Sequence, residues 1–305
     1  MLTAALIRDG VDRALAEDAP WGDLTAVNVL PESATATARL VPREAGVLSG
    51  GAVFAEAFAR VDPRVVVRLA VEDGTSFAAG ETLATVEGPA RAVLSAERVA
   101  LNFVQRMSGI ATLTARYVAA VEGTRARIVD TRKTTPGLRA FERHAVVSGG
   151  GRNHRFGLSD AVMLKDNHLA VLAAEGADLS QALRSLRERL GHMVRIEVEV
   201  DRLDQIPAVL RGGVDVIMLD NFSPDDLARG VELIAGAATV EASGGVSLAT
   251  VAAIAASGVD VISVGALTHS AVALDLGLDV ALGVDRDAER DAQRHLDGGA
   301  PAAGP

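Results

Sequence analysis

Side chains that could bind an anion are concentrated in one run of the chain, GGGRNHRFGLSDAVMLKDNH, residues 149–168. The basic members of this run are Arg152, His154, Arg155, Lys165 and His168. They flank AVML, an apolar run typical of a buried strand, although the formal net charge of the chain is −10. Arginine can bind a carboxylate through two parallel hydrogen bonds, and lysine acts as a point charge. The run therefore predicts one wall of a site for a small anionic ligand.

Other polar or glycine-bearing segments also fall where predicted strands end. Carboxyl ends of the strands are where ligand-binding loops gather in α/β barrels, so we expect these residues to converge on one mouth. They are Asp130-Thr131-Arg132-Lys133, Lys165, Glu199, Asp220, Ser243-Gly244-Gly245 and Gly265.

The cations of this set suit a ligand that carries more than one carboxylate or phosphate. They are Arg132, Lys133, Arg155 and Lys165, with His154 beside them. The alternative is that each cation pairs with a neighbouring acid and closes the rim of the barrel. For one residue alone the two interpretations are balanced, whereas four cations at adjacent strand ends favour the ligand.

Two acidic residues, Glu199 and Asp220, end consecutive predicted strands. Their carboxylates could hold sugar hydroxyls, bind Mg²⁺ through oxygen, or stabilise a developing positive charge. Glu197 has the same parity as Glu199, so both side chains should point to one face of the strand. Salt bridges to the cations are a further interpretation, and the two do not exclude each other.

Glycine-rich turns follow the two late strands, at Ser243–Gly245 and at Val264–Ala266. Turns of this kind, each opening a helix, can present backbone N–H groups to a phosphate. Glycines also make tight turns without any ligand. Two such turns on successive strands, opposite acids and bases, favour a phosphate subsite.

The composition narrows the class of protein. The 305 residues are 49% hydrophobic and only 3% aromatic, which suits helices packed on parallel strands. A pI near 5.1 argues against nucleic acid as a partner, because phosphate backbones need a basic face. The chain has no cysteine, so disulfides, thiolate catalysis and thiolate metal sites are excluded.

The N-terminal sequence indicates where the protein acts. MLTAALIRDGVDRALAED has the pattern of an amphipathic helix and lacks the apolar core and cleavage site of a secretory signal. No segment has the length of charge-free apolar sequence that spans a membrane. We therefore expect a soluble, cytoplasmic protein with no membrane partner.

The first part of the chain predicts a small α/β domain. After a helix over residues 1–18, the β-type segments ATATARLVPR, VVVRLAVEDG and ETLATVEG predict a mostly antiparallel sheet, crossed by a helix at GGAVFAEAFARV. A long helical pattern follows over residues 94–123. Within it, Ser108-Gly109 predicts either a break or the seam between domains.

The second part alternates short apolar strands with helical stretches, which predicts right-handed βαβ units in a closed or nearly closed barrel. We expect an N-terminal domain at 1–109, with 276–285 packing back on it, a barrel at 110–275 and a flexible tail at 286–305. The predicted strands are RIVDTRK, AVMLKDN, VRIEVEV, VDVIMLDN, ATVEASGG and VDVISVGA, and the predicted helices lie around 137–147, 177–190, 203–211, 224–235 and 247–257.

Several of these segments, taken in order, resemble those of nicotinate-nucleotide pyrophosphorylase (carboxylating), also called quinolinate phosphoribosyltransferase. The resemblance covers about Asp18 to Val280, and its most specific elements are DTRKT, the NHR-x-GLSD run and KDNH. One departure is Arg143-His144, where the family usually reads Lys-Tyr. The segments are EDAPWGDLT, SAERVALNFVQRMSGIAT, DTRKTTPGLR, GGGRNHRFGLSDAVMLKDNH, EVEV, MLDNFSP, EASGGV and ISVGALTHS.

The resemblance implies an N-terminal open-faced α/β sandwich and an incomplete C-terminal (β/α) barrel, in a homodimer with shared active sites. The implied reaction converts quinolinate and phosphoribosyl pyrophosphate, with Mg²⁺, to nicotinate mononucleotide, pyrophosphate and CO₂ in NAD biosynthesis. Assembly beyond the dimer is left open.

The same resemblance assigns roles to residues. Lys133, Lys165, Glu199 and Asp220 would be catalytic, and the last two would also face the ribose and its metal. Arg98 would reach the partner's site, and Arg143 would stand behind the site. The implied substrate-binding set is Arg98, Thr131, Arg132, Lys133, His154, Arg155, Lys165, Glu199, Asp220, Ser243, Gly244, Gly245, Val264, Gly265 and Ala266.

Three other functions are compatible with the residues. One is a related phosphoribosyltransferase with another substrate, such as the homologue associated with molybdenum transport or an enzyme that uses nicotinate. A second is a barrel aldolase or isomerase with Lys165 as a Schiff-base nucleophile. The third is a sensor that binds a phosphate ligand without turnover.

Overall fold

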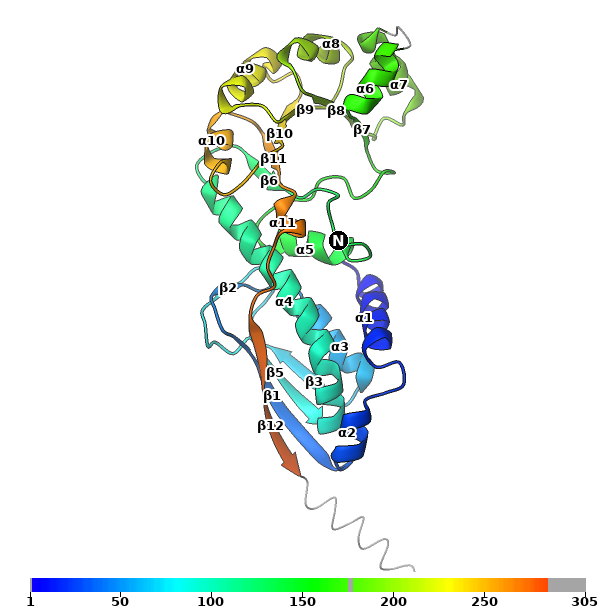
Figure 1. Ribbon diagram of the computed structural model, residues 1–305, viewed down its shortest axis with the longest axis vertical. Helices are drawn as coiled ribbons and strands as arrows, with labels where there is room; N and C mark the ends of the chain where they lie inside the picture. Colours follow the sequence, from blue (N-terminus) through cyan, green and yellow to red (C-terminus); the bar gives the residue numbers. More distant parts are fainter. Residues whose placement is uncertain (1, 175–177, 285–305) are drawn as a thin grey trace, which may run out of the picture. The chain divides into compact units, whose positions relative to one another are not determined.

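The chain forms two compact units in the computed structural model, which describes residues 2–174 and 178–284 (Figure 1). The first unit takes the described residues up to Gly109 and those from Ala273 onward. The second unit is Ile110–Val272. The tail predicted at 286–305 lies outside the described residues.

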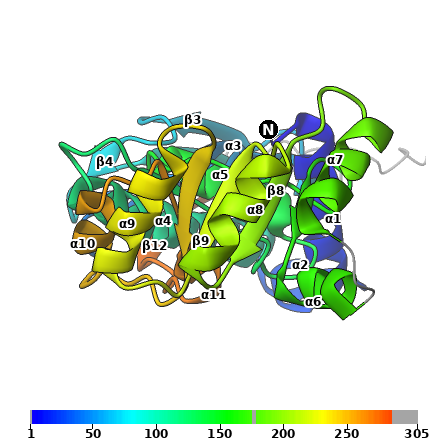
Figure 2. The same ribbon diagram turned by 90° about the horizontal axis from the view of Figure 1, so that it is seen from above.

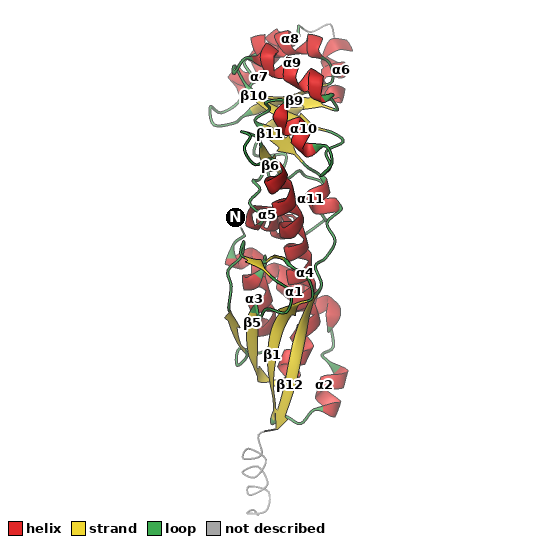
Figure 3. Cartoon of the chain, turned by 90° about the vertical axis from the view of Figure 1, so that its left-hand side faces the viewer, coloured by secondary structure: helices red, strands yellow, loops and turns green. Residues whose placement is uncertain are grey.

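The first unit contains a four-stranded antiparallel sheet in the order β12-β1-β5-β3 (Figure 3). Along β1, Ala36, Ala38 and Leu40 are buried, whereas Thr35, Thr37 and Arg39 between them are exposed. Helices therefore cover one face of this sheet and leave the other open in this chain, which confirms the open-faced sandwich. The strands are β1 (Ala34–Pro42), β3 (Val66–Leu69), β5 (Ala84–Pro89) and β12 (Leu276–Val284), with β2 (Gly46–Val47) and β4 (Ser76–Phe77) in a separate pair.

The helices of the first unit supply its aromatic core. Phe54 and Phe58 of α3 are fully buried and pack edge to face, with ring centroids 5.0 Å apart. The short helix α2 was not predicted; it begins after Asp23, whose carboxylate accepts the Ala26 N–H. The helices that begin in this unit are α1 (Ala4–Asp18), α2 (Leu24–Val29), α3 (Gly51–Val61) and α4 (Ala90–Ala120).

The long helix α4 runs without interruption through Ser108 and Gly109, so of the two alternatives at this position, a break or the seam between domains, the break was wrong. Ser108 is buried, and its hydroxyl both donates to the Ser49 carbonyl and accepts the Ser49 N–H. Because a neighbouring loop satisfies this hydroxyl, the helix backbone keeps its own hydrogen bonds. The boundary between the two units falls after Gly109, inside the helix.

The second unit is built on six parallel strands in the order β6-β11-β10-β9-β8-β7. One parallel bridge, Val129 to Arg152, extends the sheet beyond β6. No ladder joins β7 back to β6 among the residues that the structure describes, so the predicted barrel is incomplete. The strands are β6 (Arg127–Val129), β7 (Val162–Leu164), β8 (Ile196–Val200), β9 (Val216–Asp220), β10 (Thr239–Ser243) and β11 (Val261–Ser263).

Helices follow these strands and cover the outside of the sheet, as α8 and α9 do over β8 and β9 (Figure 2). The predicted helices correspond to α5, α7, α8 with the 3₁₀ turn before it, α9 and α10, and α11 is the helix expected after the turn Val264–Ala266, whereas α6 was not predicted. No helix in the described part of the chain is long and apolar enough to cross a membrane. The helices are α5 (Arg139–Ser148), α6 (Asp166–Ala174), α7 (Leu179–Arg189), α8 (Ile206–Arg211), α9 (Pro224–Ile234), α10 (Val251–Ala256) and α11 (Ala266–His269), and the 3₁₀ turn is Leu203–Gln205.

Candidate functional site

A cavity of about 590 Å³ opens at the carboxyl ends of the strands of the second unit. Its size is in the range of small-molecule sites. The sequence-predicted residues that line it are Thr131, Arg132, Lys133, His154, Arg155, Lys165, Glu199, Asp220, Ser243, Gly244 and Gly245. Asp130, which the sequence also placed at the mouth, lines the cavity, as do residues that sequence reasoning did not assign to the site, namely Met163, Met218, Asn221, Glu241 and Ser263.

Four residues predicted for the site do not line the cavity, namely Arg98, Val264, Gly265 and Ala266. Arg98 is an exposed residue of α4 in the first unit. Val264 is buried and donates its N–H to the Val129 carbonyl, so this N–H belongs to the sheet. Gly265 lies behind Lys133, where an added Cβ would meet Lys133 Cδ at 2.9 Å. Neither these two residues nor Ala266 is part of the cavity lining.

The predicted cations differ in their partners. Lys165 Nζ lies 2.6 Å from Glu199 Oε2, so here the ion-pair interpretation holds. Arg132 and Lys133 follow β6, are exposed at the mouth, and form no ion pair with the described residues. The positive charges of Arg132 and Lys133 therefore remain available to attract an anion at the mouth of the cavity.

Arg155 is held in place without being neutralised. Its guanidinium donates to the Ala161 carbonyl at 3.0 Å and to Met163 Sδ at 3.4 Å. No carboxylate forms an ion pair with it among the described residues. The side chain is thus oriented by uncharged groups, which leaves its charge for a ligand.

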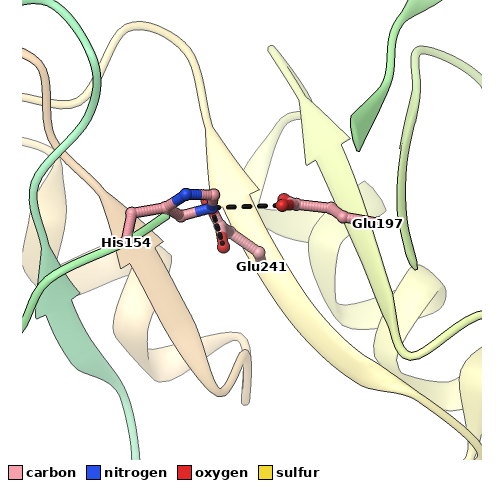
Figure 4. Close-up of side chains that lie close together, drawn as sticks. All are labelled: His154, Glu197 and Glu241. Carbon is pink, nitrogen blue, oxygen red and sulfur yellow. Dashed lines mark ion pairs between the residues drawn. The ribbon is translucent and has the colours of Figure 1, made fainter. Parts of the chain in front are cut away.

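In the wall of the cavity, His154 meets two glutamates that point toward it from β8 and β10 (Figure 4). Its Nε2 lies 3.1 Å from Glu197 Oε2 and 3.4 Å from Glu241 Oε2. Both glutamates are buried, and the Oε1 atom of each has no hydrogen-bond partner. Sequence parity placed Glu197 on this face, but nothing in the sequence indicated Glu241 as its neighbour.

We assign the charged form to the His154 ring. Burial alone would lower the pKa of His154, but hydrogen bonds to Glu197 and Glu241 outweigh burial and raise this pKa to about 10. The Arg155 N–H donates to Nδ1 and by itself favours the neutral ring. Burial and the charge of Glu241 raise the pKa of Glu197, and the hydrogen bond and charge of His154 oppose that rise, so a charged ring is the counter-charge that keeps the two glutamates ionised side by side.

The same three residues are also the kind that could hold a metal ion. One ligand atom from each of His154, Glu197 and Glu241 lies within 4.8 Å of the others. A metal would need the lone pair of Nε2, whereas the charged ring carries a hydrogen there and directs it at the carboxylates. The geometry therefore favours a buried ion-pair cluster over a metal centre.

The glycine turn after β10 requires glycine at its first position. Gly244 has φ +88°, and an added Cβ would lie 2.2 Å from Asn221 Oδ1. The Asn221 N–H donates to the Ser243 carbonyl and holds the two strand ends together. Backbone at Gly244 and Gly245 therefore borders the cavity without side chains.

Comparison with known proteins shows similarity along most of the chain. The family model "Quinolinate phosphoribosyl transferase, N-terminal domain" matches residues 23–108, and the corresponding "C-terminal domain" model matches residues 110–279.

Relatives with high identity carry consistent names. The chain is 44% identical over 279 residues to the nicotinate-nucleotide pyrophosphorylase [carboxylating] of Mycobacterium leprae, covering 89% of this chain and 96% of the relative. It is 43% identical over 262 residues to a probable nicotinate-nucleotide pyrophosphorylase [carboxylating] of Bacillus subtilis, covering 86% and 89%. The solved structure of NadC from Streptococcus pyogenes superposes with a TM-score of 0.87 at 40% identity, covering 93% of this chain and 99% of that one.

Proposed function

The chain belongs to the quinolinate phosphoribosyltransferase family, and from this we propose how its cavity carries out the reaction. The reaction joins quinolinate to phosphoribosyl pyrophosphate and yields nicotinate mononucleotide, pyrophosphate and CO₂, a step of NAD biosynthesis. The observation that carries the proposal is a single cavity in which three cations without acidic partners among the described residues, Arg132, Lys133 and Arg155, share the lining with the carboxylates of Glu199 and Asp220 and a glycine turn. These groups match a dicarboxylate, a ribose and a phosphate.

The cationic wall is proposed to bind the two carboxylates of quinolinate. Arg132 and Arg155 are the candidates for bidentate contacts, because neither has an acidic partner among the described residues. His154 and Thr131 stand beside them in the lining. Lys133 and Lys165 lie where the charge of substrate phosphates would be neutralised.

The carboxylates of Glu199 and Asp220 are proposed to face the ribose and to hold Mg²⁺. Among the described contacts each uses one oxygen, Glu199 Oε2 with Lys165 and Asp220 Oδ2 with Asn221. Carboxylate oxygens suit Mg²⁺, which in substrate sites takes few protein ligands and several from phosphates and water. A bound Mg²⁺ would neutralise charge on the pyrophosphate group as it leaves.

The turn Ser243–Gly245 is proposed to receive the 5′-phosphate of the ribose. Its backbone borders the cavity, and no side chain at Gly244 or Gly245 blocks the approach. Backbone N–H groups at such a turn suit phosphate oxygens.

Catalysis on this arrangement rests on positioning and charge. Loss of pyrophosphate from C1 of the ribose gives a transition state with positive charge on the sugar, which Glu199 and Asp220 stabilise. The pyridine nitrogen attacks C1, and the ring becomes positively charged. The positive ring stabilises the electron pair left on C2 when the 2-carboxylate leaves as CO₂, and a proton from water then bonds to C2 and gives nicotinate mononucleotide, so no covalent enzyme intermediate is needed.

We also propose that the protein acts as a homodimer in which Arg98 contributes to the partner's site. This role comes from the family resemblance, and the exposure of Arg98 is compatible with it. Arg98→Ala mixed with Lys165→Ala should regain part of the activity that each lacks. Failure to regain any activity would count against shared sites. The cytoplasmic location expected from the sequence stays a prediction.

The experiment that tests the function is an assay with quinolinate labelled in its 2-carboxylate, phosphoribosyl pyrophosphate and Mg²⁺. Labelled CO₂ and nicotinate mononucleotide should form in equal amounts. Product from nicotinate but none from quinolinate would refute the assignment. Trapping of a substrate on Lys165 by borohydride would support a Schiff-base enzyme, although the ion pair with Glu199 disfavours the neutral amine that this chemistry needs. Tight binding without turnover would indicate a sensor.

A further inference from the structure

Helix α5 lies behind two loops that carry most of the cations of the cavity. The first, Thr131–Thr135, follows β6 and is called here the TRK loop. The second, Asn153–Phe156, follows the Val129–Arg152 bridge and is called here the NHR loop. Residues of α5 bind both loops but do not line the cavity themselves.

Arg143 of α5 makes three contacts that fix the NHR loop. It donates to Asp130 Oδ1 at 3.1 Å, to the Arg155 carbonyl at 3.1 Å and to the His154 carbonyl at 2.6 Å. A planar guanidinium reaches the acid and the two carbonyls with separate N–H groups in fixed directions. The carbonyls of the two peptide groups that flank the Arg155 Cα are therefore held by one side chain.

Asp130, the acidic partner of Arg143, also binds the NHR loop directly. Its carboxylate accepts the His154 N–H at 2.8 Å and the Asn153 Nδ2 hydrogen at 2.7 Å. Asn153 Nδ2 also donates to the Arg143 carbonyl at 2.9 Å. Backbone and side-chain groups of the NHR loop are thus bonded to one buried ion pair.

Two further residues of α5 bind the TRK loop. Glu142 is buried and accepts the Thr135 N–H at 3.0 Å and the Thr135 hydroxyl at 2.8 Å. Arg139 donates to Thr134 Oγ1 at 2.9 Å and to the Phe156 carbonyl at 3.1 Å, so it connects the two loops directly. One helix therefore sets the spacing between the loops.

A contribution to stability does not by itself explain why Arg143 and Asp130 form a buried ion pair here. The carboxylate of Asp130 is fully buried, and burial raises its pKa despite the hydrogen bonds of His154 and Asn153 and the charge of Arg143. A buried ion pair of this kind is often no more stable than apolar residues of similar volume. What apolar residues could not do is fix the direction of the His154 and Arg155 backbone groups.

We propose that α5 is a positioning element for the dicarboxylate, in which Arg143 with Asp130 orients His154 and Arg155, and Glu142 with Arg139 holds the TRK loop at a fixed distance from them. Arg143 acts through Arg155 and does not touch the substrate. The proposal rests on the proposed function, because it assigns the dicarboxylate to these cations. It makes Arg143 a determinant of quinolinate affinity in particular.

The test compares Arg143→Met and Arg143→Lys with a matched arginine elsewhere. Arg187 of α7 also binds an aspartate, Asp215, and two carbonyls, those of Val194 and Gly213, but at the amino ends of β8 and β9. Arg187→Met is therefore the control for loss of an arginine that fixes two loops. Steady-state KM values for quinolinate and for phosphoribosyl pyrophosphate, kcat and Tm are measured for each full-length variant.

The expected result is a split between the two substrates. Arg143→Met should raise the KM for quinolinate about tenfold while that for phosphoribosyl pyrophosphate changes less than about twofold. Arg143→Lys, which keeps a cation with fewer directed donors, should recover part of the loss. If Arg143→Met does not fold, the KM values of Arg143→Lys for the two substrates still test the proposal.

Two outcomes would overturn the proposal. One is an equal rise in both KM values in the Arg143 variants, matching the Arg187→Met control at similar loss of Tm. The other is an unchanged KM for quinolinate in Arg143→Lys together with wild-type Tm. Both require an active wild type, whereas a wild type that does not convert quinolinate refutes the proposed function itself.

Discussion

At each end of the strands of the second unit, an arginine binds an aspartate and two backbone carbonyls. The two arginine–aspartate pairs differ in how deeply they are buried. At the carboxyl ends, Arg143 and Asp130 expose only 10% and 0% of their side chains. At the amino ends, Arg187 and Asp215 expose 32% and 27%. The fully buried pair stands behind the cavity, and the half-buried pair connects the segments that precede β8 and β9.

The electrostatics of the two aspartates differ accordingly. Burial raises the pKa of Asp130. Burial also opposes ionisation of Asp215, but hydrogen bonds from Arg187 and the Ile196 N–H outweigh it and lower the pKa of Asp215. The amino ends thus gain stability from their charges, whereas the carboxyl ends hold charge at a cost in order to place groups around a ligand. This is the division expected between the two faces of an α/β barrel.

The largest effect should come from a cation at the carboxyl ends. Lys133→Ala should lower kcat/KM by roughly 10³-fold, because a charge directed at the phosphates is lost and no partner residue replaces it. Tm should stay near that of the wild type, since Lys133 forms no ion pair with the described residues. An activity within a factor of ten of wild type would remove Lys133 from the proposed catalytic set.

The second-largest effect should separate two glycine substitutions, Gly244→Ala at the carboxyl ends of the strands and Gly236→Ala at their amino ends. Gly244→Ala, at φ +88° and against Asn221, should cost about 2–3 kcal/mol and raise the KM for phosphoribosyl pyrophosphate about tenfold. Gly236→Ala, at φ +77° in open space before β10, should cost only about 1 kcal/mol and leave both KM values unchanged. Urea unfolding and steady-state kinetics measure both. Equal kinetic effects of the two substitutions would abolish the distinction between the ends.

Arg187→Met should show a smaller effect, confined to stability. It removes an ion pair and two carbonyl contacts, so the free energy of unfolding should fall by about 1–2 kcal/mol. The KM for quinolinate should not change. A selective rise of that KM would show that loops at the amino ends also set the geometry of the site.

The smallest expected effect is a pH dependence of the stability that the Arg187–Asp215 ion pair contributes. Because the folded pKa of Asp215 is lowered, its ionisation contributes stability above its ordinary value of 3.8, and this contribution is lost as pH falls through the folded pKa. The difference in unfolding free energy between wild type and Arg187→Met should therefore shrink below about pH 3.8. A difference that stays constant down to pH 2.5 would assign the effect to the carbonyl contacts alone.

The convergence of the site could be predicted from the sequence, because a parallel sheet brings the ends of its strands to one edge. Lys165, Glu199 and Asp220 were located by that rule alone. Parity also placed Glu197 beside Glu199. These predictions needed only the period of the strands and the order of the chain.

Other features depended on contacts that no local pattern contains. The attachment of Arg143 to the NHR loop requires three directions in space, and the pairing of His154 with Glu241 joins a loop to a distant strand. Val264 resembled part of a phosphate turn, but its N–H completes the ladder to Val129. The helix α4 continued through Ser108 because a loop far away in sequence satisfied its hydroxyl.

The difference between the two ends can be tested by locating bound quinolinate. The amino ends also offer a cavity of about 480 Å³ with two arginines, Arg125 and Arg127. In a crystal structure of the protein with quinolinate, the ligand carboxylates should lie against Arg132 and Arg155 at the carboxyl ends. Quinolinate bound only beside Arg125 and Arg127, with the other cavity empty, would contradict this placement.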